Sequence, residues 1–188
     1  MEDGTPKENT TVATVTHLKF VVPETADSLI VAANNDSDGF IEVWELSEKP
    51  QPVHKVFQPK AANDSFKTVI WQHQALYKCQ QPITAITTTK LSILNPASHI
   101  LVALADSSIR CLNHDGLKEI AVTSLNANWR QDEPLSKYTK ISSTISHIDM
   151  SWLGCIFLLC DTQGNIYVYK VLPEGNFYLK SSYIQKKK

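Results

Sequence analysis

The chain has 188 residues, a formal net charge of -1 and 43% hydrophobic residues, which are ordinary values for one globular domain or part of one. The nearly neutral charge excludes a global electrostatic attraction to nucleic acid or to an anionic membrane. The longest apolar run, LGCIFLLC from Leu153, is much shorter than the roughly 20 residues of a membrane-spanning helix. The composition therefore predicts neither direct nucleic-acid binding nor a membrane span.

The two ends of the chain differ in composition from its middle. Residues 1–15 are polar and acidic, whereas a secretory signal is basic and then apolar. Residues 182–188 end in three lysines and are interpreted as a basic tail. The four cysteines contain no C-x-x-C pair, which favours buried free thiols in a reducing compartment. We expect the folded region to span residues 16–181.

A short unit recurs along this middle region. DSDGFIEVWEL from Asp36 resembles DTQGNIYVYKV from Asp161, and ADSSIRCLNH from Ala105 is a weaker copy in which Ser107 takes the glycine place. Aspartate accepts hydrogen bonds from its own backbone and glycine tolerates a positive φ, so Asp-x-x-Gly predicts a turn. The turn residues are Asp36, Gly39, Asp106, Asp161 and Gly164. The apolar positions that follow them in phase are Ile41, Val43, Ile109, Cys111, Ile166 and Val168.

Short strands are predicted around each turn. Apolar runs precede the turns (SLIVAA from Ser28, HILVAL from His99, CIFLLC from Cys155), and ahead of these come THLKF from Thr16, ITAIT from Ile83 and SHIDM from Ser146. Their length and flanking turns favour strands. A fourth strand per unit is predicted at TVIWQ from Thr68, EIAVTS from Glu119 and NFYLK from Asn176. Four antiparallel strands per repeat are typical of a β-propeller blade.

The repeat spacing exceeds the ~40 to 45 residues of a regular WD-type blade. Two polar, proline-containing segments account for the excess, near residues 47–66 and near residues 126–143. Because prolines exclude a central strand, both segments are predicted to be long surface loops, where partner contacts are expected. Three blades are too few to close a propeller. The predicted fold is therefore all-β, with about three four-stranded antiparallel blades of an incomplete WD40-type propeller.

No catalytic or metal-binding constellation is recognisable. The chain has no G-x-S-x-G elbow, phosphate-binding glycine loop or H-E-x-x-H pair, and its six histidines are scattered. The sequence thus predicts no enzyme activity, no cofactor and no small-molecule substrate. The repeated aspartates could hold a cation, but a turn-stabilising role is favoured.

The four tryptophans lack the interleaved Lys and Arg of a single-strand-binding surface. Trp44 and Trp152 are expected in the core, with Trp44 packed between blades. Trp129, beside Arg130, is the candidate exposed interface anchor, because Trp and Arg are common in interface hot spots. A local packing role for Trp129 is an equal alternative.

Three stretches carry a family resemblance: FIEVWELSEKPQPVHKVFQ from Phe40, TVIW from Thr68 and SWLGCIFLLCDTQGNIYVYKVLP from Ser151. They resemble the WD-repeat region of the Mediator subunit 16 family, over about Thr16 to Pro173 and in the same order. The usual Gly-His is absent, and Trp44-Glu45, Leu112-Asn113 and Tyr169-Lys170 stand where WD repeats carry Trp-Asp. Members of the family are much longer than this chain, so it reads as a partial chain.

The resemblance implies a non-catalytic, nuclear subunit of the Mediator tail module, a coactivator that bridges gene-specific activators and the RNA polymerase II machinery. Its expected partners are other tail subunits and transcriptional activators. Two alternatives remain open on the residues alone. One is a generic WD-repeat scaffold in cytoplasmic signalling or trafficking. The other is a propeller enzyme whose catalytic residues lie in blades outside this chain.

Overall fold

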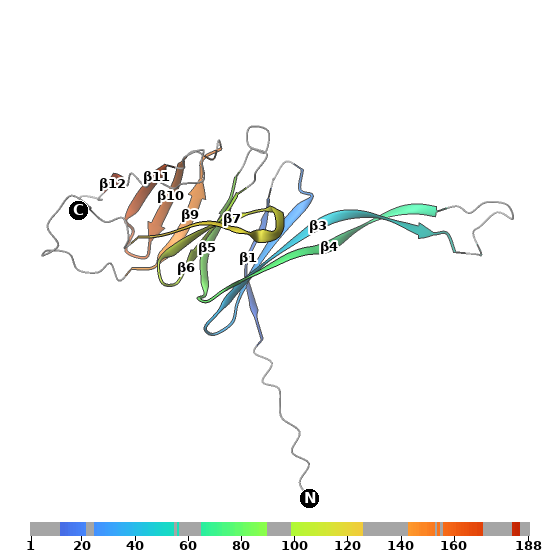
Figure 1. Cartoon of the computed structure of the whole chain (residues 1–188), viewed down its shortest axis with the longest axis horizontal. Helices are drawn as coiled ribbons and strands as arrows, with labels where there is room; N and C mark the ends of the chain where they lie inside the picture. The colour runs from blue at the N-terminus through green and yellow to red at the C-terminus, as the bar shows by residue number, and fades with distance from the viewer. Residues whose placement is uncertain are drawn as a thin grey trace, which may run out of the picture.

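Three antiparallel four-stranded sheets form the fold, and they lie side by side with the second sheet in the middle (Figure 1). The computed structural model describes residues 12–21, 25–54, 56, 65–89, 99–125, 143–152, 154, 156–170 and 182–184. The predicted fold class, about three antiparallel blades of an incomplete propeller, is confirmed.

Each sheet is built from strands that are consecutive in the chain. The first contains β1 (Thr14–Phe20), β2 (Ser28–Asn34), β3 (Gly39–Pro52) and β4 (Ser65–Cys79). The second contains β5 (Ile83–Thr88), β6 (His99–Leu104), β7 (Ser108–Asn113) and β8 (Glu119–Ser124), with the 3-10 turn η2 (Asp115–Leu117) before β8. The third contains β9 (Ile145–Met150), β10 (Ile156–Asp161), β11 (Ile166–Lys170) and β12 (Ser182–Ile184).

Two apolar cores hold the sheets face to face. The first core lies between the first and second sheets and includes Ile30, Ile41, Val43, Ile100, Val102 and Leu112. The second core lies between the second and third sheets and includes Leu101, Ile109, Cys111, Phe157, Leu159 and Tyr169. The second sheet is therefore buried on both faces, which explains why β6 reads as the nearly continuous apolar run HILVAL.

The stacked rings of Phe157 and Tyr169, with centroids 4.9 Å apart, add an aromatic contact within the second core. Cys79 and Cys111 are buried free thiols, as predicted. Burial raises the pKa of Cys79 to about 11 and that of Cys111 to about 12. Both side chains therefore act as small apolar groups in the cores.

Most of the predicted strands are present, but two boundaries change. The predicted fourth strand from Asn176 falls outside the described residues, and β12 pairs with β11 at Ser182–Ile184 instead. The interpretation of residues 182–188 as a tail is therefore wrong for Ser182–Ile184. At the other end, β1 begins at Thr14, inside the segment 1–15 expected to precede the fold.

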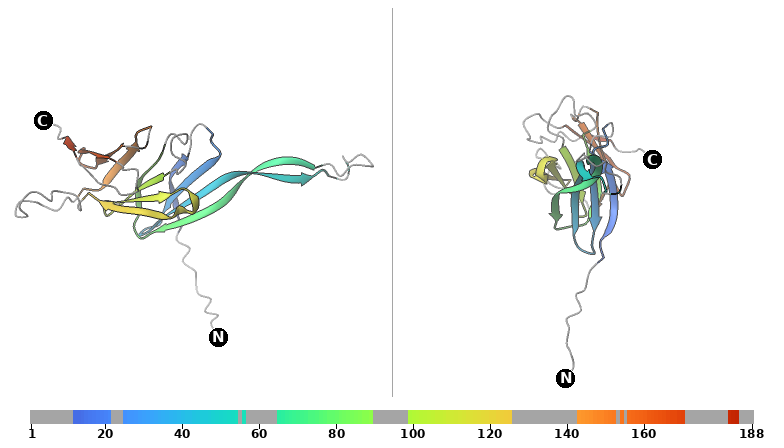
Figure 2. Two further views of the ribbon diagram at one scale, coloured as in Figure 1. Left: turned by 45° about the horizontal axis from the view of Figure 1, so that its top comes forward. Right: turned by 90° about the vertical axis from the view of Figure 1, so that its right-hand side faces the viewer.

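The predicted loop near residues 47–66 is wrong at both of its ends. Ser47–Pro52 belongs to β3 and pairs with Ser65–Ile70 of β4. These residues form a two-stranded ribbon that extends away from the three sheets (Figures 1 and 2). We call the paired residues 46–52 and 65–71 the arm. The second predicted loop, near residues 126–143, lies outside the described residues except for Ser143.

Prolines fit in the arm because β3 has no second neighbour there. The pairing of β2 with β3 ends at Ser28 and Glu45, so beyond the Leu46 N–H, which still bonds the Asp27 carbonyl, β3 has a free edge within the described residues. In such a ribbon every second residue directs its N–H away from the partner strand, where proline removes no ladder hydrogen bond. Pro50 and Pro52 are two residues apart, so the backbone nitrogens of both are directed to the same side of the ribbon. Proline is excluded from central strands, but it is tolerated in an edge strand such as this part of β3.

Gly39 is required for its small size and not for a positive φ. A Cβ at this position would lie 2.8 Å from Ile83 Cγ1, 2.9 Å from Asn34 Oδ1 and 3.1 Å from the Gln81 carbonyl oxygen. Asn34 also accepts from Ile83 N–H (2.8 Å) and donates to its carbonyl oxygen (2.9 Å). The start of the second sheet thus lies directly against the first turn. The positive φ expected at the turns occurs at Ser107 (65°) and Gly164 (82°).

Substitution Gly39→Ala tests this close approach. The added Cβ must displace Ile83 and the Asn34 amide, so we expect a loss of about 1 to 3 kcal/mol in the free energy of unfolding. Urea unfolding of this chain measures the change. Ser37→Ala, at an exposed position in the same turn, is the matched control and should change stability by less than about 0.5 kcal/mol. Equal stability of the two variants would contradict the packing argument.

Candidate interaction surface

Asp161 is the hub of a buried polar network in the third turn. Its carboxylate accepts from the Ser143 hydroxyl (2.9 Å), the Tyr167 hydroxyl (3.0 Å), the Gln163 N–H (3.0 Å), and both the backbone and side-chain amides of Asn165 (2.8 Å each). Burial by itself raises the pKa of this carboxyl, but the hydrogen bonds outweigh burial and hold the pKa below its ordinary value. Asp161 therefore has a structural role at this turn.

The other turn aspartates are less engaged. Asp106 is exposed and accepts one hydrogen bond, from the Ser108 N–H (2.9 Å). Asp36 is exposed in the first turn. Among the described residues, no group of three or more His, Cys, Asp or Glu side chains is arranged to hold a metal ion. Nor does the described part contain a helix long and apolar enough to cross a membrane.

The repeated apolar positions point in one direction along the stack. Ile41 and Val43 of the first sheet lie in the first core, which faces the second sheet. Ile109 of the second sheet lies in the second core, which faces the third sheet. The equivalent Ile166 and Val168 lie on the far side of the third sheet, where no further sheet is present in the described residues. The repeat thus leaves the third sheet with an uncovered apolar face.

We call this uncovered face the third-sheet outer face. It consists of Ile156, Leu158, Cys160, Ile166 and Val168, in which Leu158 lies opposite Val168 and Cys160 opposite Ile166. Ile156, Leu158 and Ile166 are between 42% and 47% exposed, whereas Phe157 and Leu159 between them are buried. β10 is therefore apolar on both faces but buried on one.

A second apolar face lies at the opposite end of the stack. This first-sheet outer face includes Leu18 opposite Val31, and Phe20 opposite Leu29, which in turn lies opposite Trp44. Leu18 and Phe20 are exposed. The face was not identified from the sequence, although the alternation in THLKF already placed Leu18 and Phe20 on one side.

Trp44 lies on this outer face, so among the described residues it is not packed between two sheets. Its indole donates to Glu42 (3.0 Å) and packs edge-on against His73 of β4 (centroids 5.2 Å apart). The equivalent residues of the other repeats, Leu112 and Tyr169, are buried between sheets. Trp44 is half-buried because the first sheet has no preceding neighbour among the described residues.

The first-sheet outer face continues onto the arm. Leu46 lies opposite Trp71 and Glu48 opposite Val69, on the same side of the ribbon as Trp44. Leu46, Val69 and Trp71 are exposed, and so are Phe66 and Ile70 on the other side of the ribbon. Sequence reasoning placed Val69, Ile70 and Trp71 in a strand but did not identify the apolar surface of the arm, because their partner residues 47–52 were interpreted as a loop.

Trp152 was expected in the core, but its side chain is 60% exposed after β9 ends. This prediction is wrong because Trp152 follows β9 in a turn rather than continuing its alternation. The candidate anchor Trp129 and its neighbour Arg130 lie outside the described residues.

A polar cluster joins the first two sheets at their edge. Tyr77 donates to Glu119 (2.6 Å), and Arg110 donates to both Tyr77 (3.0 Å) and Glu119 (2.6 Å). The Tyr77 hydrogen bond, together with the Arg110 hydrogen bond and charge, lowers the pKa of Glu119 against the smaller opposing effect of burial. We interpret this cluster as a contact between the first two sheets, in which Arg110 Nη1 bonds both partners while its buried Nε has no hydrogen-bond partner.

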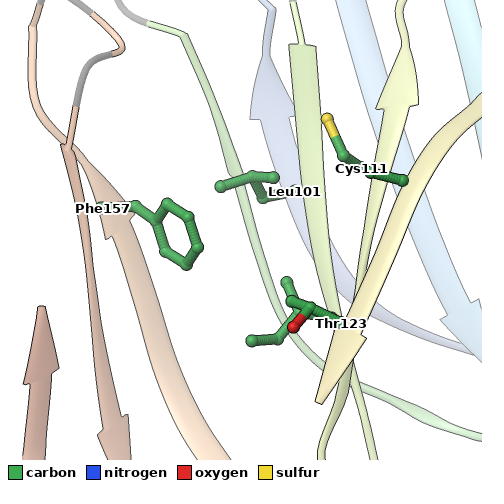
Figure 3. Close-up of a pocket in the computed structure, with 6 residues that line it drawn as sticks. Leu101, Cys111, Thr123 and Phe157 are labelled. Atoms are coloured by element: carbon green, nitrogen blue, oxygen red, sulfur yellow. The ribbon is translucent and has the colours of Figure 1, made fainter. Parts of the chain in front are cut away.

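A small gap remains between the second and third sheets. About 160 Å³ of space, partly open to solvent, is lined by Leu101, Ile109, Cys111, Ala121, Thr123 and Phe157. Phe157 points from β10 toward Leu101 across this gap (Figure 3). The lining carries no charged side chain, and its one polar side chain is Thr123. We interpret the gap as imperfect packing, because a ligand site needs several convergent polar groups.

Comparison with known proteins gives the family. The family model described as Mediator complex subunit 16, N-terminal, matches residues 1–150. The chain belongs to the Mediator complex subunit 16 family. The suspected family is thereby confirmed, and the matched range includes the stretches from Phe40 and Thr68 that carried the resemblance.

Relatives within the family are similar over most of this chain. A protein of Aedes aegypti named Mediator of RNA polymerase II transcription subunit 16 is 40% identical over 157 residues, covering 83% of this chain and 19% of that protein. The identically named protein of Homo sapiens is 22% identical over 180 residues, covering 85% of this chain and 20% of that protein. The Xenopus laevis one is 22% identical over 188 residues, covering 89% and 27%. The chain thus spans only a fifth to a quarter of these relatives.

Among solved structures, the β-propeller domain of Myceliophteria thermophila Cps50 (Swd1) aligns with a TM-score of 0.44 and 9% sequence identity. The alignment covers 84% of this chain and 40% of that domain.

Substitution Asp161→Asn tests the polar network. Losing the carboxylate weakens several buried hydrogen bonds, so we expect about 2 kcal/mol less stability at pH 7. Because the folded-state pKa is lowered, the carboxylate's contribution is complete above its unfolded-state pKa of roughly 4 and is lost as pH falls through the folded-state value. The stability difference from the unsubstituted chain should therefore shrink as pH falls from 5 to 3.

Urea unfolding across this pH range measures the difference. Asp106→Asn, at the exposed aspartate of the second turn, is the control and should cost less than about 1 kcal/mol. A difference for Asp161→Asn that grows on acidification would show that the assigned direction of the pKa is wrong.

Proposed function

We propose that the chain is a non-catalytic, protein-interaction part of the Mediator complex, a nuclear coactivator that bridges gene-specific activators and the RNA polymerase II machinery. Membership of the Mediator subunit 16 family carries this proposal. It is supported by the structure's exposed apolar faces. The proposed partners are other tail-module subunits and transcriptional activators.

The two outer faces have different proposed roles from the arm. Ile166 and Val168 occupy the positions through which each preceding sheet packs against the next one. The third-sheet outer face is therefore a packing surface for a further blade. The relatives are several times longer than this chain, which leaves ample sequence for such blades. The first-sheet outer face is the corresponding packing surface for the blade that closes the propeller. The arm projects beyond the blades and is therefore available to partner proteins.

The contiguous exposed apolar side chains of the third sheet support the assignment of its outer face as a packing surface. Large apolar side chains on a sheet face ordinarily mark an interaction site when they are contiguous. On the third sheet they are contiguous across β10 and β11, as the pairing of Leu158 with Val168 shows. Water contact with such a face is unfavourable by about 25 cal/mol per Å². A covering blade removes this contact without any change in the existing strands.

Affinity capture of the full-length protein from nuclear extract tests the proposed function. We expect capture to recover other Mediator subunits in a constant ratio through washes of rising salt concentration, because apolar contacts are little weakened by salt screening. An epitope tag alone, captured in parallel, is the control. Recovery of cytoplasmic trafficking or signalling proteins, with no Mediator subunit, would contradict the proposal and favour the generic scaffold.

A further inference from the structure

The two long edges of the arm differ in how they are protected against strand addition. Along β3, the edge of residues 47–52 carries Pro50 and Pro52, which block a ladder. Along β4, residues 65–71 contain no proline and one charged residue, Lys67, and they include the run TVIW, whose residue types favour strands. Natural proteins protect exposed edges with proline, charge or bulges. The β4 edge of the arm lacks most of this protection.

The pairing fixes which amides face the β4 edge. The Leu46 N–H donates to the Asp27 carbonyl (2.8 Å), so the backbone N–H of Leu46 is directed away from β4. In an antiparallel ladder the residue opposite then also directs its N–H and C=O outward. That residue is Trp71, and by alternation Val69 and Lys67 share its orientation. The same alternation places Pro50 and Pro52 on the outward side of β3, where they cost no bond within the arm.

The outward groups of β4 have no partner strand in the described part of the chain, where β4 pairs with β3 alone. At the inner end of β4 the second sheet is close, because Tyr77 reaches Glu119. Beyond this contact, the arm extends away from every sheet (Figure 2). A two-stranded ribbon alone is at best marginally stable in water. A third strand would both satisfy the outward groups and stabilise the ribbon.

The apolar surface of the arm is also large enough for a specific interface. Leu46, Phe66, Val69, Ile70 and Trp71 are between 38% and 59% exposed, which leaves on the order of 400 Å² of apolar side-chain surface in water. One side of a standard protein interface buries about 800 Å², slightly more than half of it apolar. The exposed apolar surface therefore matches one partner's share. The arm's ion pair, Lys67 with Glu48 (2.6 Å), leaves little net charge to repel a partner.

We propose that the β4 edge of the arm, residues 65–71, is the docking site for an extended segment of another protein subunit, which adds as a third strand. Backbone hydrogen bonds to Lys67, Val69 and Trp71 supply the register, and alternate apolar side chains of the added strand pack beside Val69 and Trp71. The inference rests on the proposed function, since a subunit of a multi-protein complex meets other chains. The added strand belongs to a different protein and not to a second copy of this chain.

Residue-resolved hydrogen exchange tests the proposal with the full-length protein, first alone and then in the purified Mediator complex. In the free protein, the amides of Val69 and Trp71 should exchange quickly, while those of Ile70 and Gln72, bonded to β3, exchange slowly. Within the complex, Val69 and Trp71 should slow by at least roughly tenfold, because their N–H groups gain acceptors. Unchanged exchange of both amides in the complex would overturn the proposal, even if the arm is contacted on its faces.

A pair of proline variants separates the two edges. Val69→Pro removes an outward donor of β4 while leaving the bonds between β3 and β4 in place, so association of the full-length protein with the complex should weaken roughly fivefold to tenfold. Glu48→Pro makes the same backbone change on the blocked edge of β3 and should leave association within about twofold. Equal weakening by both variants would indicate that the arm acts through its shape or faces, and would overturn the edge assignment.

Two further readouts complete the test. Analytical ultracentrifugation of the free full-length protein should show a monomer, and a dimer abolished by Val69→Pro would overturn the heterologous partner. If full-length protein recovers no Mediator subunit at all, the proposed function itself fails. If it assembles normally but Val69 and Trp71 keep exchanging quickly, only the strand-addition inference fails.

Discussion

The structure depends on one constraint, that an apolar sheet face must be covered by another sheet. The second sheet meets it fully, because its two faces supply the first and second cores through alternate residues such as Ile100 and Leu101. In the described residues, the first and third sheets are each covered by another sheet on one face only. Every other feature follows from this arrangement: Gly39 permits the close approach of the first two sheets, and Asp161 organises the turn that orients β10 and β11. The uncovered faces are the positions at which we propose that further blades pack.

The sequence predicted the parts of this fold that depend on local chemistry. Asp-x-x-Gly turns and short apolar runs are set by neighbouring residues, so the strands before and after each turn, such as β2 and β10, were located correctly. Features that depend on tertiary neighbours were not. Pro50 and Pro52 suggested a loop because nothing local shows that β3 loses its β2 neighbour there. Trp152 suggested a core residue because its exposure depends on the turn after β9, and the size restriction at Gly39 depends on Ile83.

The candidate surface was the least predictable feature, since exposure is a property of the assembled sheets. Leu158 and Leu159 are identical residues in one strand, yet one faces solvent and the other lies in the second core. The arm shows the same limit, because its apolar residues gain meaning only when β3 and β4 are seen to pair beyond the blade. Conversely, the repeat did contain the direction of stacking: Ile41, Ile109 and Ile166 occupy one position, and within the described part of the chain only Ile166 lacks a sheet to cover it.

Cysteine labelling at position 158 tests directly whether the third-sheet outer face is a packing surface for a further blade. Leu158→Cys is introduced into the full-length protein and into the 188-residue chain, with Val122→Cys on exposed β8 as the control in both. We expect a polar thiol reagent to label the control in both proteins, and to label position 158 quickly in the short chain but at least roughly tenfold more slowly in the full-length protein. Equally fast labelling of position 158 in both proteins would contradict it.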